Sequence, residues 1–195
     1  MQSVAWEELE MRVLAALVRF ISGINRLVGN VFSWLALAIV LVCFTVVVQR
    51  YLFSTTQLWM QDLYVWLNGA MFTAVAGFAL LRNDHVRVDI FYRPATTRTK
   101  AIIDIIGVLL FLLPFCFIVY VYGITFVQRS WRIYEASANP GGMPGLFVLK
   151  SFIIAFAALI ALQGIAMLMR SILVLGRSEH LLPVELRYES DGSAH

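Results

Sequence analysis

The chain has 195 residues, of which 61% are apolar and only 14% are charged. Soluble domains carry about 25% charged residues, so this composition, with a mean hydropathy of +0.81, excludes an ordinary soluble protein and indicates a membrane protein. The 15 basic residues give a formal net charge of +3 and are spread over the connecting segments. Because they form no dense basic stripe, they argue against a nucleic-acid partner and are better explained by membrane topology.

Residues 1–28 precede the first long apolar run. The short apolar run at 13–18 is broken by Arg19 and cannot span a bilayer, and the acidic extreme N-terminus does not fit a signal peptide. On a helix, arginines spaced by seven share one face while apolar residues occupy the rest. We therefore expect an amphipathic helix in the cytoplasmic membrane interface, anchored to lipid headgroups by Arg12, Arg19 and Arg26.

Four segments reach the roughly 20 residues that a helix needs to cross the hydrocarbon core. They are continuously apolar and lack the alternation of barrel strands, so we predict an all-α integral membrane protein. The spans are expected at about 31–50, 63–82, 101–127 and 151–173. They form a four-helix transmembrane domain over 29–175, which leaves 176–195 as a polar cytoplasmic tail, partly disordered.

The distribution of Lys and Arg predicts the orientation, because short cytoplasmic loops retain these residues preferentially. An even number of spans places both termini on one side, and cytoplasmic termini put eleven basic residues inside and four outside. The inner set is Arg12, Arg19, Arg26, Arg82, Arg87, Arg93, Arg98, Lys100, Arg170, Arg177 and Arg187, and the outer set is Arg50, Arg129, Arg132 and Lys150. We therefore predict that both termini are cytoplasmic.

Ionisable residues within the spans are few. Asp62 begins the second span, and Asp104 lies one turn into the third, where Lys100 at i−4 is expected to pair with it. No span carries a chain of carboxylates, which argues against a proton pump or an ion channel. All three histidines lie outside the spans, which argues against haem ligation. Cys43 and Cys116 lie in apolar runs and form no disulfide framework or redox motif.

The second span carries small residues at fourfold spacing, at Gly69, Thr73 and Gly77. Such a stripe lets a neighbouring helix approach closely. The neighbour is either a partner subunit or another helix of this chain, and the residues leave both open. The candidates for a subunit interface are Trp59, Asp62, Trp66, Asn68, Gly69, Thr73, Gly77 and Gln163.

The charged stretch at 82–93 raises the question of a metal or catalytic site. Asp84, His85 and Asp89 offer three ligands, but the interspersed arginines repel a cation. No nucleophile elbow or phosphate-binding Gly loop accompanies them. We predict no metal, cofactor or catalysis here, and expect His85, Arg87 and Asp89 to hold a cytoplasmic hairpin. A small membrane enzyme or redox subunit that uses His85 and Asp89 is the alternative.

A second candidate surface follows the third span, where Arg129, Trp131, Arg132 and Tyr134 cluster. An exposed Trp/Arg/Tyr group has the composition of an interface hot spot. The alternative is an aromatic belt with basic flanks.

The order of these features resembles the small membrane subunit of tripartite ATP-independent periplasmic (TRAP) transporters, the DctQ family. The resemblance covers roughly residues 15–175, and where the family more often has glutamate this chain has the shorter Asp62. The matching residues are Trp59, Asp62, Trp66-Leu67-Asn68-Gly69-Ala70, His85-Val86-Arg87-Val88-Asp89, Asn139-Pro140-Gly141-Gly142-Met143-Pro144-Gly145, Lys150 and Leu162-Gln163-Gly164.

The resemblance implies a non-enzymatic part of a secondary transporter for organic acids in the bacterial inner membrane. A periplasmic binding protein would deliver the substrate, and a large multi-span permease subunit would move it by a sodium-coupled elevator motion. This chain would be the small permease subunit, a scaffold that braces the large one. Its partners would be that subunit, transiently the binding protein, which the Arg129 to Tyr134 surface could contact, and membrane lipids.

Overall fold

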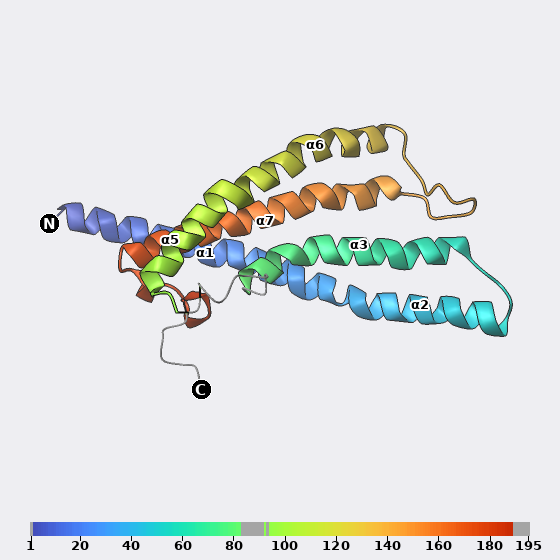
Figure 1. Cartoon of the computed structure of the whole chain (residues 1–195), viewed down its shortest axis with the longest axis horizontal. Helices are drawn as coiled ribbons and strands as arrows, with labels where there is room; N and C mark the ends of the chain where they lie inside the picture. Colours follow the sequence, from blue (N-terminus) through green and yellow to red (C-terminus); the bar gives the residue numbers. More distant parts are fainter. Residues whose placement is uncertain (1, 83–91, 93, 189–195) are drawn as a thin grey trace.

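The computed structural model describes residues 2–82, 92 and 94–188. All regular elements in this part of the chain are helices (Figure 1). Four helical stretches are long and apolar enough to cross a membrane: Glu8–Leu52, Leu58–Leu81, Thr97–Arg132 and Leu146–Leu175. For the described residues, the prediction of an all-α protein with four apolar helices long enough to span a membrane is thus confirmed.

The first stretch consists of two consecutive helices, α1 (Gln2–Ser33) and α2 (Leu35–Leu52). Trp34, between them, keeps helical backbone angles, so α2 continues the course of α1 (Figure 1). The apolar stretch Glu8–Leu52 has 45 residues, about twice what one crossing requires. The expected first span at 31–50 corresponds to α2, and the expected N-terminal helix extends to Ser33 as α1.

Helix α1 packs lengthwise against α3 (Leu58–Leu81) and α7 (Leu146–Leu175). One side of α1 is buried, at Ala15, Val18, Ser22 and Asn25. The opposite side exposes apolar residues, namely Leu9, Val13, Leu17, Phe20, Leu27 and Val31. Arg12, Arg19 and Arg26 lie exposed on a third side.

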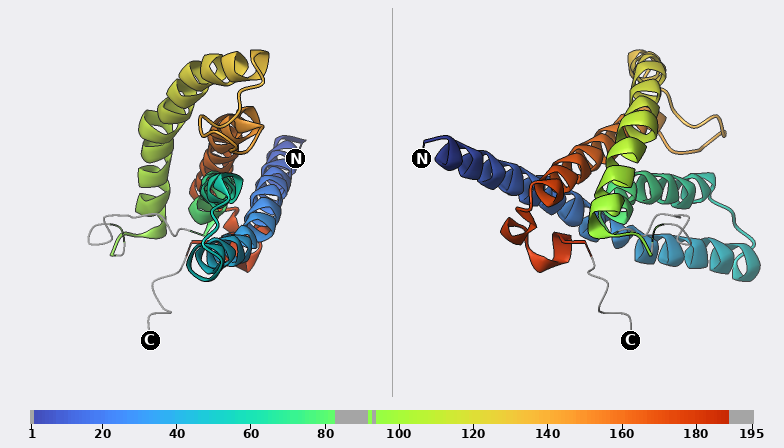
Figure 2. Two further views of the ribbon diagram at one scale, coloured as in Figure 1. Left: turned by 90° about the vertical axis from the view of Figure 1, so that its right-hand side faces the viewer. Right: turned by 60° about the vertical axis from the view of Figure 1, so that its left-hand side comes forward.

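The third apolar stretch is not a uniform α-helix. It consists of α5 (Thr97–Gly107), a π-helical turn η1 (Val108–Leu112) and α6 (Leu113–Arg132). Pro114 follows the π turn; proline has no N–H to donate and its ring clashes with the carbonyl four residues before it, which accounts for the wider turn. The stretch curves along its length (Figure 2).

The π turn lies against α7, where a Cβ built on Gly164 would come within 2.4 Å of Leu112 Cδ2. The core here includes Leu80 of α3, Cys116 of α6, and Ile160 and Met167 of α7. Cys43, in contrast, is exposed on α2.

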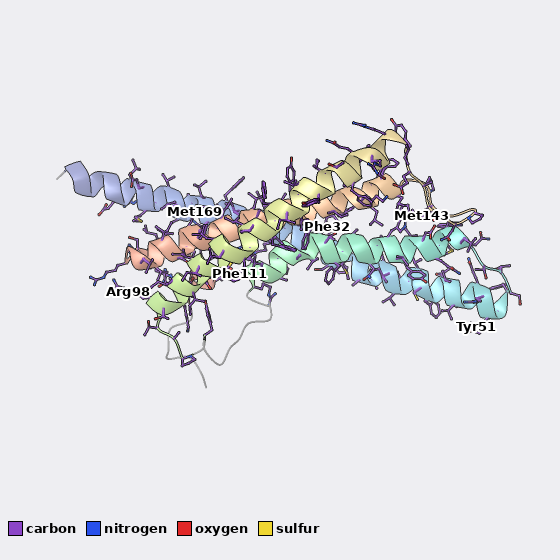
Figure 3. The ribbon with its side chains drawn as sticks, turned by 45° about the horizontal axis from the view of Figure 1, so that its top comes forward. Phe32, Tyr51, Arg98, Phe111, Met143 and Met169 are labelled. Carbon is purple, nitrogen blue, oxygen red and sulfur yellow. The ribbon has the colours of Figure 1, made fainter. Side chains whose placement is uncertain are left out.

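The helices form two hairpins, α2 with α3 and α6 with α7, whose ends diverge at one end of the bundle (Figure 1). We call this the outer end; it carries residues 53–57 and 133–145. Both ends of the described chain lie toward the opposite, inner end (Figure 1). Among the labelled side chains, Tyr51 and Met143 lie at the outer end and Arg98 at the inner end (Figure 3).

The first part of the expected polar tail, residues 177–188, folds back onto the bundle. It forms two short 3-10 turns, η2 (Glu179–Leu181) and η3 (Val184–Leu186). Leu182 and Leu186 are buried in one cluster with Ala15 and Val18 of α1 and Leu173 of α7. These two leucines make residues 179–188 part of the core at the inner end.

Candidate functional site

At the outer end, Asp62 of α3 binds the loop between α6 and α7. Its Oδ1 accepts a hydrogen bond from Asn139 Nδ2 at 2.9 Å, and its Oδ2 accepts one from the backbone N–H of Met143 at 3.0 Å. The residue is only 9% exposed. Met143 accordingly lies beside the beginning of α3 (Figure 3).

Glycine in this loop permits the close approach. A Cβ built on Gly142 would lie 2.3 Å from Asp62 Oδ2 and 2.7 Å from Ser137 Cβ. The backbone of the loop is closed on itself, because Ser137 N donates to Met143 O at 3.0 Å and Gly142 N donates to Asn139 O at 2.9 Å. Gly141 adopts φ +78°, a left-handed conformation that costs glycine little. The carboxylate therefore fits directly against the loop backbone.

The predicted docking cluster adjoins this loop in sequence. Trp131 Nε1 donates to Ser151 Oγ at 2.8 Å, and the rings of Trp131 and Tyr134 both contact Phe147, with centroids 4.6 and 5.7 Å away. Trp131 is 46% and Tyr134 73% exposed, and Arg129 and Arg132 are exposed. The structure thus holds the two aromatic residues against α7 and leaves much of their surface free.

A salt bridge also links α7 to the segment after α6. Lys150 Nζ lies 2.5 Å from Glu135 Oε2 and 4.2 Å from the centroid of the Phe126 ring. The hydrogen bond from Lys150 holds the pKa of the Glu135 carboxyl below its ordinary value of 4.5. Glu135 is therefore charged at neutral pH and neutralises Lys150.

At the inner end, Asp104 of α5 accepts hydrogen bonds from three segments. Arg170 of α7 lies 3.1 Å from Oδ2, and both side chains are buried, at 8% and 6% exposed. The hydroxyl of Tyr188 donates to the same oxygen at 2.6 Å, and that of Tyr92 lies 3.2 Å from each carboxylate oxygen. The predicted Lys100–Asp104 pair is wrong, because Arg170 supplies the cation; the Lys100 ammonium lies 5.8 Å from the Tyr92 ring centroid.

Tyr188 ties the C-terminal segment to this inner cluster. Its hydroxyl lies 3.0 Å from Ser171 Oγ, and the Arg170 guanidinium lies 4.2 Å from its ring centroid. Burial raises the pKa of the Tyr188 phenol well above its ordinary value, so the hydroxyl stays a donor. A further salt bridge at 2.6 Å joins Glu185 to Arg26 of α1.

Between the two ends, a pair of buried amides joins α1 to α7. Asn25 Nδ2 donates to Gln163 Oε1 at 3.1 Å, and the residues are 1% and 3% exposed. Gly77 of α3 packs against them, since a Cβ there would lie 2.2 Å from Asn25 Oδ1 and 3.2 Å from Leu159 Cβ. Three helices of this chain meet at this point.

The candidates for a subunit interface separate into two groups. Asp62, Gly77 and Gln163 are buried among helices and loops of the chain itself. Thr73 donates to the Gly69 carbonyl of its own helix at 2.8 Å. The candidates with free surface are Trp59, 44% exposed, and Asn68, while Trp66, Gly69 and Thr73 are half-buried.

His85, Arg87 and Asp89, with Asp84, lie outside the described residues. Among the residues that the structure describes, no group of three His, Cys, Asp or Glu side chains could hold a metal ion.

Sequence reasoning did not identify Arg170, Tyr188 and Asn139 as contact residues. Arg170 offered one signal, since a charge within an apolar span implies a buried partner. Nothing local distinguishes the other two, because their contacts with Asp104 and Asp62 cross 84 and 77 residues of sequence.

Comparison with protein families matches residues 39–174 to tripartite ATP-independent periplasmic transporters, DctQ component. Searches of curated proteins and of solved structures give no match. The matched region includes α3, the loop bound by Asp62, and the Asp104–Arg170 pair. It is a family of transporter components and not of enzymes. The chain belongs to the DctQ family and is the small, multi-pass membrane component of a TRAP transporter, a tripartite system that also comprises a large permease and a periplasmic binding protein.

Proposed function

We propose that this chain is a scaffold subunit that braces the large permease subunit and takes no direct part in moving the substrate. The observation that carries the proposal is how its buried polar groups are used. Asn25 pairs with Gln163, and Asp104 pairs with Arg170. A transport path needs polar groups that can exchange partners with a substrate or ion, whereas these pairs hold helices together.

The proposed orientation has both termini in the cytoplasm. The inner end holds the first part of α1, the end of α3, the beginning of α5, the end of α7 and the segment after α7 as far as Tyr188 (Figure 1). Nine of the 15 Lys and Arg residues belong to these parts of the chain, and the positive-inside rule favours the cytoplasm for them. They are Arg12, Arg19, Arg26, Arg82, Arg98, Lys100, Arg170, Arg177 and Arg187. The outer end then faces the periplasm, across the bacterial inner membrane.

Helix α1 broadens the proposed scaffold. It carries three arginines that a bilayer core would not accept at low cost, while α2 has no charged residue before Arg50. We therefore place α2 across the bilayer and the arginine-bearing part of α1 at the inner interface, inclined along α7. Arg12 and Arg19 would bind anionic headgroups. Arg26 would bind them too, but it also forms a salt bridge with Glu185.

The surface available to the large subunit comprises α2, which has no buried residue, and the exposed part of α3 at Trp59 and Asn68. The outer cluster of Arg129, Trp131, Arg132 and Tyr134 would contact the binding protein transiently. The transported substrate would be an organic acid, moved by the large subunit with sodium. Nothing in a scaffold needs to touch that substrate.

The test is to express the chain with its neighbouring reading frames, purify it by a tag in mild detergent, and identify the co-purifying proteins by mass spectrometry. A stoichiometric large multi-span protein is expected. Proteoliposomes that contain this chain alone should take up no sodium or organic acid. Purification of the chain alone, or uptake by the chain alone, would contradict the scaffold role.

A further inference from the structure

The Asp62 carboxylate connects the two helical hairpins at the outer end. Asp62 belongs to the α2–α3 hairpin, and the loop that it binds belongs to the α6–α7 hairpin. The two hairpins diverge toward this end, and the loop reaches from one to the other (Figure 1). The side chain of Asp62 thus ties the loop to α3 at Asn139 and Met143.

The contacts of this carboxylate hold the loop in one shape. It binds the loop at Asn139 and at Met143, on either side of Pro140 and Gly141, which are exposed. The donors at Asn139 and Met143, and the Ser137 side chain beside them, are neutral groups, so the carboxylate neutralises no cation of the loop. Here a buried carboxylate orders an exposed loop. This arrangement implies that the ordered shape of the loop serves a function such as binding a partner.

The charges around the loop indicate the nature of the partner. Both acidic residues at the outer end already have partners within the chain. Asp62 accepts hydrogen bonds from the loop, and Glu135 forms a salt bridge with Lys150. Among the described residues, no carboxylate lies within salt-bridge distance of Arg50, Arg129 or Arg132. The outer surface is therefore positive, and its complement is an acidic face. Lipid phosphates would bind the arginines, but only a folded partner can fit the shape of a loop.

We infer that Asp62 is a positioning residue for a docking surface made of residues 137–143 with Arg132 and Tyr134, and that its occupant is an acidic face of the periplasmic binding protein. This inference rests on the proposed function, in which that protein contacts the outer cluster. Because Asp62 orders the loop before the partner arrives, docking avoids the entropic cost of ordering it.

The test measures binding of the co-encoded periplasmic binding protein to the complex of small and large subunits in nanodiscs of zwitterionic lipid. Two variants disturb the contact from opposite sides: Asp62→Asn removes the charge, and Gly142→Ala forces the carboxylate away. Each should raise Kd about tenfold and speed hydrogen exchange of the amides in 137–143. The matched control is Gly107→Ala, where an added Cβ meets nothing within 4 Å, and it should change neither quantity.

The outcomes separate this inference from the proposed docking role. If Arg132→Glu weakens binding, with a loss that shrinks at high salt, while Asp62→Asn and Gly142→Ala bind like wild type, the docking surface stands and positioning by Asp62 is overturned. Positioning by Asp62 is also overturned if the amides of 137–143 exchange at the wild-type rate in both Asp62→Asn and Gly142→Ala. If the wild-type complex does not bind the protein, docking itself fails. If the Asp62→Asn variant does not assemble, Asn139→Ala is the alternative, because it removes only one donor to the carboxylate. It should also raise Kd and speed hydrogen exchange in 137–143, but by less.

Discussion

Asp62 and Asp104 each bind an irregular segment of the chain to the bundle, but in different surroundings. Asp62 accepts from a side-chain amide and a backbone N–H, whereas Asp104 faces the buried cation of Arg170 as well as two tyrosine hydroxyls. Removing the outer carboxylate leaves two neutral hydrogen-bond donors unpaired near the surface. Removing the inner one leaves a buried charge without a partner. The inner aspartate therefore supports the global fold, and the outer one supports the shape of a loop.

The largest expected effect comes from making the same substitution at both positions. Asp104→Asn should destabilise the chain by about 3–5 kcal/mol, because Arg170 stays buried and unpaired, whereas Asp62→Asn should cost about 1–2 kcal/mol of hydrogen bonding. Denaturant unfolding of both variants in one detergent would measure the difference. A combined Asp104→Leu and Arg170→Met variant should recover most of the inner loss. Equal losses at the two aspartates would refute the distinction.

Gly77→Ala tests whether the middle of the bundle is packed as tightly as the inner end. The added methyl group would overlap Asn25 Oδ1, and overpacking typically costs about 1–3 kcal/mol. Gly69→Ala is the control, since its Cβ would meet Leu149 Cδ1 at an ordinary 3.4 Å. Thermal unfolding in micelles should show a lower midpoint for Gly77→Ala alone. The same midpoint for both would mean that α1 and α3 separate easily.

Tyr188→Phe tests whether the inner cluster secures the C-terminal segment. The ring stays and its hydroxyl bonds to Asp104 and Ser171 are lost, a change of about 1 kcal/mol. Trypsin should then cleave faster after Arg177 and Arg187 in the detergent-solubilised protein. Tyr51→Phe is the control, because Tyr51 is 79% exposed. If the two variants are cleaved at the same rate, Leu182 and Leu186 alone hold the segment.

The smallest effect concerns the pH dependence of the outer salt bridge. Because the pKa of Glu135 is lowered in the folded chain, its contribution is fully present above the ordinary value of 4.5 and is lost as the pH falls through the lower folded value. Solvent screens this pair, so its contribution is the smallest of those compared here. Unfolding at pH 7 and at pH 3 should show a loss on acidification that is smaller in Glu135→Gln. An identical loss in both proteins would assign the pH effect to other carboxylates.

The sequence predicted the helical elements better than the contacts between them. The four spans and the family were identified because long apolar runs and short motifs are local features. The predicted partner of Asp104 was wrong. Lys100 was predicted because it is the nearest cation along the helix, whereas the actual partner, Arg170, is 66 residues away. The loop bound by Asp62 was noted only as a stretch that matches the family, at Asn139 to Gly145, and its contact with Asp62 was not predicted. The burial of Leu182 and Leu186 was not foreseen in a segment of polar composition.

The sequence by itself determined that this protein has four helical spans, because a bilayer core leaves an apolar run no other way to satisfy its backbone hydrogen bonds. Its even number of spans also placed both termini at one end. Only the tertiary structure decided which groups meet inside: Arg170 with Asp104, Asn25 with Gln163, and Asp62 with the outer loop. The physical reason is that helix formation depends on neighbours within a few residues, whereas each of these buried groups needs a partner that folding brings from far along the chain.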